Sequence, residues 1–244
     1  MELPFEKTVC RYWKQKLYTL LKTEETQELR LPDSMPDVGR IISTWSQVIL
    51  RGKEWRGREI QITGGIMLWV LYAPEDGSGE QCMESWIPFQ MRWDLSEDCP
   101  EGKIRIRCIP RFVDARSVSA RKIMVRAGTA AQAEAFVPRT LDLWEPEQEP
   151  ETVELLRTSW PVRMPMEAGE KSFLMDEELE LPGAEAVPEK LISFRLDPKV
   201  TEKKVLGNKL VFRGNGNLHI LYRSEEGQLH SWDFPLPFSH TANA

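Results

Sequence analysis

The sequence lacks the short motifs that mark the common nucleotide-dependent and nucleophilic enzymes. Its 244 residues contain no P-loop, no Gly-x-Gly-x-x-Gly dinucleotide fingerprint and no Gly-x-Ser-x-Gly nucleophile elbow. The GNGN stretch at residues 214–217 is not followed by the Lys-Ser/Thr pair of a phosphate loop, and we interpret it as a hairpin turn. We therefore expect no catalytic residue and no cofactor, and the sequence indicates that the protein is not an enzyme.

Histidine is scarce, and the cysteines are not spaced for metal binding. The chain has three histidines and four cysteines, and no two cysteines have the Cys-x-x-Cys spacing of zinc sites. The N-terminal stretch MELPFEKTVCRYWKQK has no apolar core like that of a secretory signal peptide. We expect no metal site and reduced, partly buried thiols, which indicates a cytoplasmic protein.

Long apolar runs and an excess of positive charge are also missing. No run of eighteen apolar residues occurs, so the sequence predicts no membrane-spanning helix. The net charge of −6 gives no reason to expect a nucleic-acid partner. The 41% hydrophobic and 29% charged content is that of a globular protein of one or two domains.

The sequence matches itself without a gap when it is shifted by 150 positions. The match runs from Gln27 to Gly77, and it places QELRLPDSMPDVGRIIS over EELELPGAEAVPEKLIS at residues 177–193. It includes Leu-x-Leu-Pro, two glycines seven positions apart and Leu-Tyr-x-x-Glu-x-Gly. With small gaps it extends to two further pairs, Ser85-Trp86 over Ser231-Trp232 and Pro88-Phe89 over Pro237-Phe238. We interpret the chain as a tandem duplication.

The repeat predicts two domains joined by a linker. The first domain is expected at residues 8–137, a Glu/Pro-rich linker at 138–152, and the second domain at 153–244. The second match stops near Phe238, so the second domain has no counterpart of residues 90–137. Either the chain is a fragment, or the second domain is naturally short and completes its sheet in another way.

The dominant hydrophobic period is two, which predicts a mainly β protein. GKIRIRCIPRF alternates cleanly, with Ile104, Ile106 and Cys108 on one face. KIMVRAGTAAQAEA suits a strand or, through its alanines, a helix, and DVGRIIST suits one helical turn or the start of a strand. Gly64-Gly65 predicts a bulge or kink in a long strand, or the turn of a hairpin. We expect antiparallel sandwich-like or barrel-like domains in tandem, each with at most one short helix, the second incomplete.

Two clusters of residues are candidates for function. Asp33 and Asp37 could be paired carboxylates, but the second unit has Gly183 and Val187 there, and Pro-Asp pairs suit turns. We interpret this stretch as a structural turn, formed by Leu31, Pro32, Pro36, Asp37, Val38 and Gly39. The second cluster is basic and is a candidate interaction surface, formed by Lys103, Arg105, Arg107, Arg111, Arg116 and Arg121. A solvated sheet face is the alternative.

The nine tryptophans have two interpretations. The repeat places Trp86 and Trp232 at equivalent positions, which favours packing in a core. Exposed tryptophans would instead stack against sugars, so a carbohydrate- or peptidoglycan-binding β module is the alternative function. An aligned row of exposed rings would favour it.

Two motifs, in order, resemble the SPOCS domain of the SipL-like sporulation proteins of clostridial Firmicutes. ELRLPDSMPDVGRIIS resembles the opening signature of that family, a strand ending in Leu-Pro, then a Pro-Asp-Ile/Val turn and an apolar strand. SVSARKIMVRA, at residues 117–127, resembles its Ser-Pro-Arg-Lys-Ile-x-Val-Arg-Ala element, with Ala120 in place of proline. The second unit has lost the Pro-Asp turn.

The resemblance implies tandem β domains and a non-enzymatic role in assembling the spore envelope or coat. It implies protein partners in that envelope and a location in the mother cell or at the forespore surface. The family's SipL members bind a coat ATPase through a C-terminal LysM domain. This sequence has no LysM-like segment, so that partnership is not carried over. The oligomeric state is left open.

Overall fold

The computed structural model describes residues 5–146, 156, 158–181 and 186–243, and the described parts contain nine strands and no helix. The mainly β prediction is confirmed, whereas the expected short helices are absent from these parts. The strands are β1 Phe5–Arg30, β2 Val38–Arg56, β3 Glu59–Pro74, β4 Gln81–Asp94, β5 Lys103–Ser119, β6 Lys122–Pro146, β7 Pro188–Leu206, β8 Lys209–Ser224 and β9 Leu229–Asn243.

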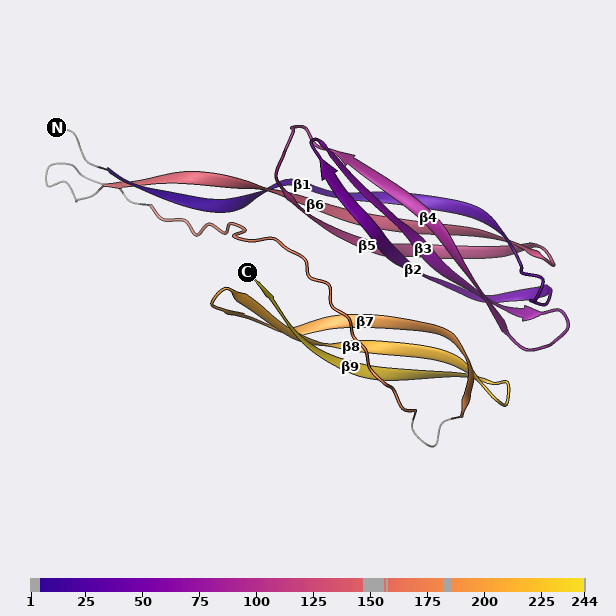
Figure 1. Cartoon of the computed structure of the whole chain (residues 1–244). Helices are drawn as coiled ribbons and strands as arrows, with labels where there is room; N and C mark the ends of the chain where they lie inside the picture. Colours follow the sequence, from indigo (N-terminus) through magenta and orange to yellow (C-terminus); the bar gives the residue numbers. More distant parts are fainter. Residues whose placement is uncertain (1–4, 147–155, 157, 182–185, 244) are drawn as a thin grey trace.

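The strands form three antiparallel sheets of three strands each. Sheet A has the order β1-β6-β5, sheet B the order β2-β3-β4, and sheet C the order β7-β8-β9. Sheets A and B lie face to face as a sandwich (Figure 1) and share one apolar core. Their long strands give each sheet one apolar face, and burying those two faces against each other removes both from water.

The core draws on the alternating residues of both sheets. The buried members on β3 include Ile60, Ile62 and Leu68, and those on β6 include Ile123 and Val125. The predicted alternation on β5 is confirmed, because its three alternating apolar residues pack against this core. The Thr44 hydroxyl donates to the Val113 carbonyl oxygen at 3.1 Å, so β2 lies beside β5. The sheets nevertheless stay separate, and the barrel alternative is not observed.

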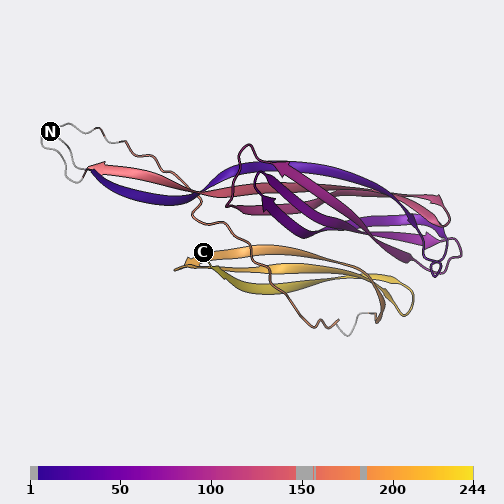
Figure 2. The same cartoon turned by 45° about the horizontal axis from the view of Figure 1, so that its top comes forward.

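Sheet A is longer than sheet B and projects beyond it. The ladder between β5 and β6 ends where Lys103 pairs with Phe136, whereas β1 and β6 stay paired out to Phe5 and Pro146. Residues 5–14 and 137–146 therefore form a two-stranded ribbon, which extends away from the sandwich in both views (Figures 1 and 2).

Sheet C repeats the local geometry of sheet B, with each equivalent residue 150 positions later in the sequence. Three register shifts in β2, at 38/40, 41/43 and 50/52, recur in β7 at 188/190, 191/193 and 200/202. Gly64 faces the Ile49 carbonyl and the Phe89 ring, and Gly214 faces the Lys199 carbonyl and the Phe238 ring. A Cβ atom at either glycine would overlap both neighbours. This correspondence supports the hypothesis that the chain contains an internal repeat.

Several predicted boundaries were wrong. β3 runs unbroken through Gly64-Gly65, so these glycines lie in a long strand, one of the two predicted alternatives, and the β2 bulge between Leu50 and Gly52 lies opposite Gly64. β8 runs unbroken through residues 214–217, so the hairpin turn predicted there is not formed. Strands tolerate these glycines because the ring of a neighbouring strand fills the space above them. Residues 138–146 of the predicted linker belong to β6, because β1 pairs with them. Residues 147–152 lie outside the described part of the chain. The two ambiguous stretches, KIMVRAGTAAQAEA and DVGRIIST, form strands.

Candidate functional site

The predicted turn between β1 and β2 is held by one arginine from the β5–β6 turn. The Arg121 guanidinium donates to the carbonyl oxygens of Met35 at 2.6 Å and Pro32 at 2.7 Å. It also donates to the Asp37 carboxylate at 2.9 Å. The Asp33 carboxylate lies 3.7 Å away and is fully exposed, so its contribution is small. One planar, permanently charged donor group thus fixes several acceptors of the turn.

Backbone contacts complete this joint. The amide of Leu31 donates to the Arg121 carbonyl at 3.0 Å, and the amide of Val38 donates to the Ala120 carbonyl at 2.8 Å. The buried Tyr72 hydroxyl donates to the Pro36 carbonyl at 2.9 Å, and burial raises the pKa of this phenol. The two motifs of the sequence, far apart in the chain, therefore meet in one place. Asp37 is an ion-pair partner of Arg121 within this joint.

The residues of the predicted basic cluster fall into three groups according to their contacts. Arg121 belongs to the joint between the strands, and it does not share the open face of sheet A. Most of the others pair with acids on neighbouring elements: Lys103 with Glu167, Arg105 with Glu134 at 3.3 Å, and Arg111 with Glu24 at 3.4 Å. Arg107 and Arg116 are exposed and form no ion pair within the described residues.

The acid at the centre of this face is Glu24 of β1. The Arg126 guanidinium bonds to its carboxylate, and Arg111 approaches from the other side. These contacts, the hydrogen bond from Arg126 first, hold the pKa of Glu24 below its usual range. The sheet supplies these acids from strands distant in sequence, so the face is less basic than β5 alone suggests. Two exposed cations without a described ion pair remain, Arg107 and Arg116, nine positions apart along β5.

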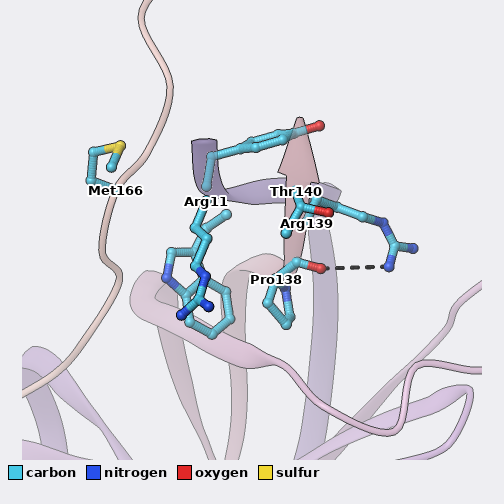
Figure 3. A pocket seen from close by; sticks show the side chains of 7 residues that line it. Arg11, Pro138, Arg139, Thr140 and Met166 are labelled. Carbon is cyan, nitrogen blue, oxygen red and sulfur yellow. Dashed lines mark hydrogen bonds between the residues drawn. The ribbon is translucent and has the colours of Figure 1, made fainter. Parts of the chain in front are cut away.

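An open groove of about 630 Å³ lies where the ribbon leaves the sandwich (Figure 3). It is lined by Arg11, Tyr12, Trp13, Pro138, Arg139, Thr140 and Met166. Met166 comes from the coil that runs past the ribbon, and the Trp13 amide donates to the Pro165 carbonyl at 2.8 Å. The Lys103 ammonium lies 4.6 Å from the centre of the Trp13 ring, so a cation already occupies one face of that ring.

The tryptophans do not form an exposed row. Only Trp144 on β6 and Trp160 in the coil are more than half exposed, at 59% and 78%. Trp86 packs over Gly65 and under Arg51, on the face of sheet B that points away from the core. Trp232 is directly opposite Ile220, which occupies the place of Val70 in sheet B, and Val70 is opposite Met83. The predicted equivalence of Trp86 and Trp232 is therefore wrong.

His219 has partners that the sequence did not reveal. Its ring nitrogens face two carboxylates, Asp233 on β9 and Asp197 at 3.4 Å on β7. All three lie on exposed positions of sheet C, and cross-strand register brings them together. A hydroxyl or thiol nucleophile does not join them among the described contacts, and the arrangement is that of a surface polar network.

The four cysteines are free, and two of them are held in the protonated form. Burial raises the pKa of the Cys82 thiol to about 11, and burial also raises the pKa of Cys108. Such thiols are poor nucleophiles near neutral pH because only the thiolate reacts. Within the described residues, no three His, Cys, Asp or Glu side chains gather closely enough to hold a metal ion. A helix that could cross a membrane is not found in the described part of the chain.

Residues 188–244 match the family model described as SipL, SPOCS domain. The matched range contains the three strands of sheet C, whereas the motifs that resemble this family in sequence lie in the sandwich. No curated protein and no solved structure matches the chain. The match associates the chain with sporulation. Sheet C, at the C-terminal end of the described chain, is therefore similar to the SPOCS domain of SipL.

Proposed function

We propose that this protein is a non-enzymatic scaffold in the assembly of the spore envelope or coat. The observation that carries the proposal is the SPOCS match over residues 188–244. The arrangement of the titratable groups agrees with it, since they serve a strand joint, surface ion pairs and a surface network. The protein would work in the cytoplasm of the mother cell or at the forespore surface.

Scaffolding of this kind would act through the surfaces of the sheets. On β5 of sheet A, the exposed cation Arg107 lies two positions from exposed Ile109, and the exposed cation Arg116 lies two positions from exposed Val118. This combination suits a protein partner that offers acids around an apolar contact. We propose that the partners are proteins of the spore envelope.

Deletion of the gene in the sporulating host tests the proposal. We expect misassembled envelope layers in thin-section electron micrographs and reduced resistance of the spores to heat or lysozyme. Complementation with the wild-type gene should restore both properties. Normal, fully resistant spores in the deletion strain would refute the proposal.

A pair of charge variants tests the surface. Arg107→Glu with Arg116→Glu should reduce co-purification of envelope proteins from sporulating cells. Arg195→Glu, a change of an exposed arginine on sheet C, is the matched control. Equal recovery of partners with both variants would exclude this face as the binding surface.

A further inference from the structure

Sheet C has an apolar face without a second sheet to cover it. Residues that are directly opposite in an antiparallel ladder share a face. When the ladders of sheet C are compared with those of sheet B, one set of side chains lies on the face that corresponds to the buried face of sheet B. This set is Phe194 and Leu196 on β7, Leu218 and Ile220 on β8, and Trp232, Phe234 and Phe238 on β9. The opposite face carries the polar network around His219.

This apolar face is exposed where its counterpart in the sandwich is buried. Phe194 is 50% exposed and Leu196 38%, and the β8 residues are only half-buried. In sheet B, the matching positions on β3, Leu68 and Val70, are completely buried under sheet A. Exposed apolar area of this kind marks an interaction site in a folded protein.

One segment of the chain already lies across part of this face. Residues 171–181, which we name the cover segment, run over sheet C without forming a strand (Figure 1). The Phe173 ring stacks on His240 with centroids 3.7 Å apart, and it also approaches Phe212 and Phe238. The Lys171 ammonium donates to the Thr241 carbonyl.

The cover segment has the sequence of a strand that lacks its partner. The 150-residue shift places it on residues 21–31, which β1 pairs with β6 through Leu21–Ala131 to Arg30–Lys122. Phe173, Met175 and Leu179 alternate with polar or exposed residues, as in a half-covered strand. Its backbone takes part in no described ladder, so its donors and acceptors are available for a neighbouring strand.

The ribbon of sheet A offers what this site lacks. It is two-stranded, and no described strand pairs with the outer edge of its β6 part, because β5 ends before it. Its inner row continues from buried Val137 through Arg139 to Leu141 and Leu143, which are 42% and 44% exposed. Cys10 is opposite Leu141 and belongs to the same row. The ribbon is thus a part of sheet A that extends beyond the sandwich, whereas sheet C has no described sheet packed on its apolar face.

The charges of the two surfaces are complementary. The cover segment carries four acids that form no ion pair within the described residues, Asp176, Glu177, Glu178 and Glu180. The ribbon carries three cations that likewise form no described ion pair, Arg11, Lys14 and Arg139. Opposite charges on neighbouring strands stabilise their pairing.

We propose that the occupant of the sheet C face is a second copy of this chain. The ribbon of one molecule lies on sheet C of the next, and the free edge of its β6 part pairs with the cover segment. The ribbon and cover segment together make a three-stranded sheet, the same number of strands as sheet A. Because the two surfaces differ, the contact is head-to-tail, and repeating it generates chains of molecules. The proposal deepens the scaffold function and rests on it for its biological role.

The test uses the full-length protein and two blocked variants. Leu141→Asp with Leu143→Asp blocks the ribbon, and Phe194→Asp blocks sheet C. All three side chains are exposed, so each variant should keep the wild-type circular dichroism spectrum. Val118→Asp, an equally exposed position on β5 outside both surfaces, is the control. Sedimentation velocity and light scattering measure size across the micromolar range.

The wild type and the Val118 control should grow beyond dimers as concentration rises, and each blocked variant alone should stay monomeric. A mixture of the two blocked variants should stop at a dimer, because each supplies the surface that the other lacks. A wild type that stays monomeric would overturn the proposal. A ribbon variant that still forms dimers through sheet C would also overturn it. A mixture of the two blocked variants that stays monomeric would do the same. Normal spores after gene deletion would instead overturn the proposed function and leave self-association standing.

Discussion

The joint held by Arg121 makes a quantitative prediction about stability. Arg121→Ala removes hydrogen bonds to three backbone carbonyls, those of Leu31, Pro32 and Met35, and the ion pair with Asp37. A hydrogen bond involving a charged group contributes about 1.5–3 kcal/mol when both partners are shielded from water. The side chain is 33% exposed, so water replaces part of this loss. We expect the free energy of unfolding to fall by about 2–4 kcal/mol.

Urea unfolding followed by tryptophan fluorescence, with calorimetry, measures the change. A loss of this size lowers the melting temperature of the sandwich by about 10 °C. Arg105→Ala is the control, since Arg105 is 57% exposed and has one ion pair at 3.3 Å. An exposed pair contributes about 0–1 kcal/mol. If the Arg121 and Arg105 variants unfold alike, the joint does not depend on the arginine and the reasoning is refuted.

Three further predictions concern single groups. Tyr72→Phe should lower the free energy of unfolding by about 1 kcal/mol, because it removes a buried hydrogen bond. Tyr222→Phe should leave the free energy of unfolding unchanged, because the buried Tyr222 hydroxyl has no partner among the described residues. Equal losses in urea unfolding would contradict this. The ion pairs of Glu24 hold its pKa below the usual glutamate value. They therefore stabilise the fold fully at pH values above that usual pKa, and this stabilisation is lost as the pH falls through the lowered pKa. NMR titration should show that Arg126→Gln moves the Glu24 pKa upward, and an unchanged value would argue against the contact. Alkylation of Cys82, followed by mass spectrometry, should keep accelerating until the pH approaches the thiol pKa of about 11; a plateau near pH 9 would disagree.

The period-two pattern was enough to predict the β class, because every strand with one buried face must alternate. β5 is the clearest case, with its apolar row on the core and its arginines outside. Glycines misled the same reasoning at residues 214–217, and at residues 64–65 they left a long strand and a hairpin turn as alternatives. There the missing side chain makes room for a ring from the neighbouring strand, and only the three-dimensional register reveals that ring.

The contacts between strands could not be predicted from local sequence. The two SPOCS-like motifs were recognised separately, but nothing in either of them says that Arg121 reaches Met35 and Pro32. The partners of His219 could not be predicted either, because its two carboxylates lie on two other strands. Residues 138–146 were predicted as linker because the Glu/Pro-rich stretch WEPEQEPETVE begins among them, at Trp144. Pairing with β1 makes them a strand.

The pairing of β1 with β6 has a consequence for biosynthesis. Of the described strands, β1 leaves the ribosome before the others, and its partner β6 is the last strand of the sandwich, with Phe5 opposite Pro146. At about 5–20 residues per second, β1 waits on the order of ten seconds for that partner. Sheet C, built from consecutive strands, can form as soon as each hairpin is complete. During synthesis the exposed edge of β1 is therefore the segment most in need of protection by a chaperone.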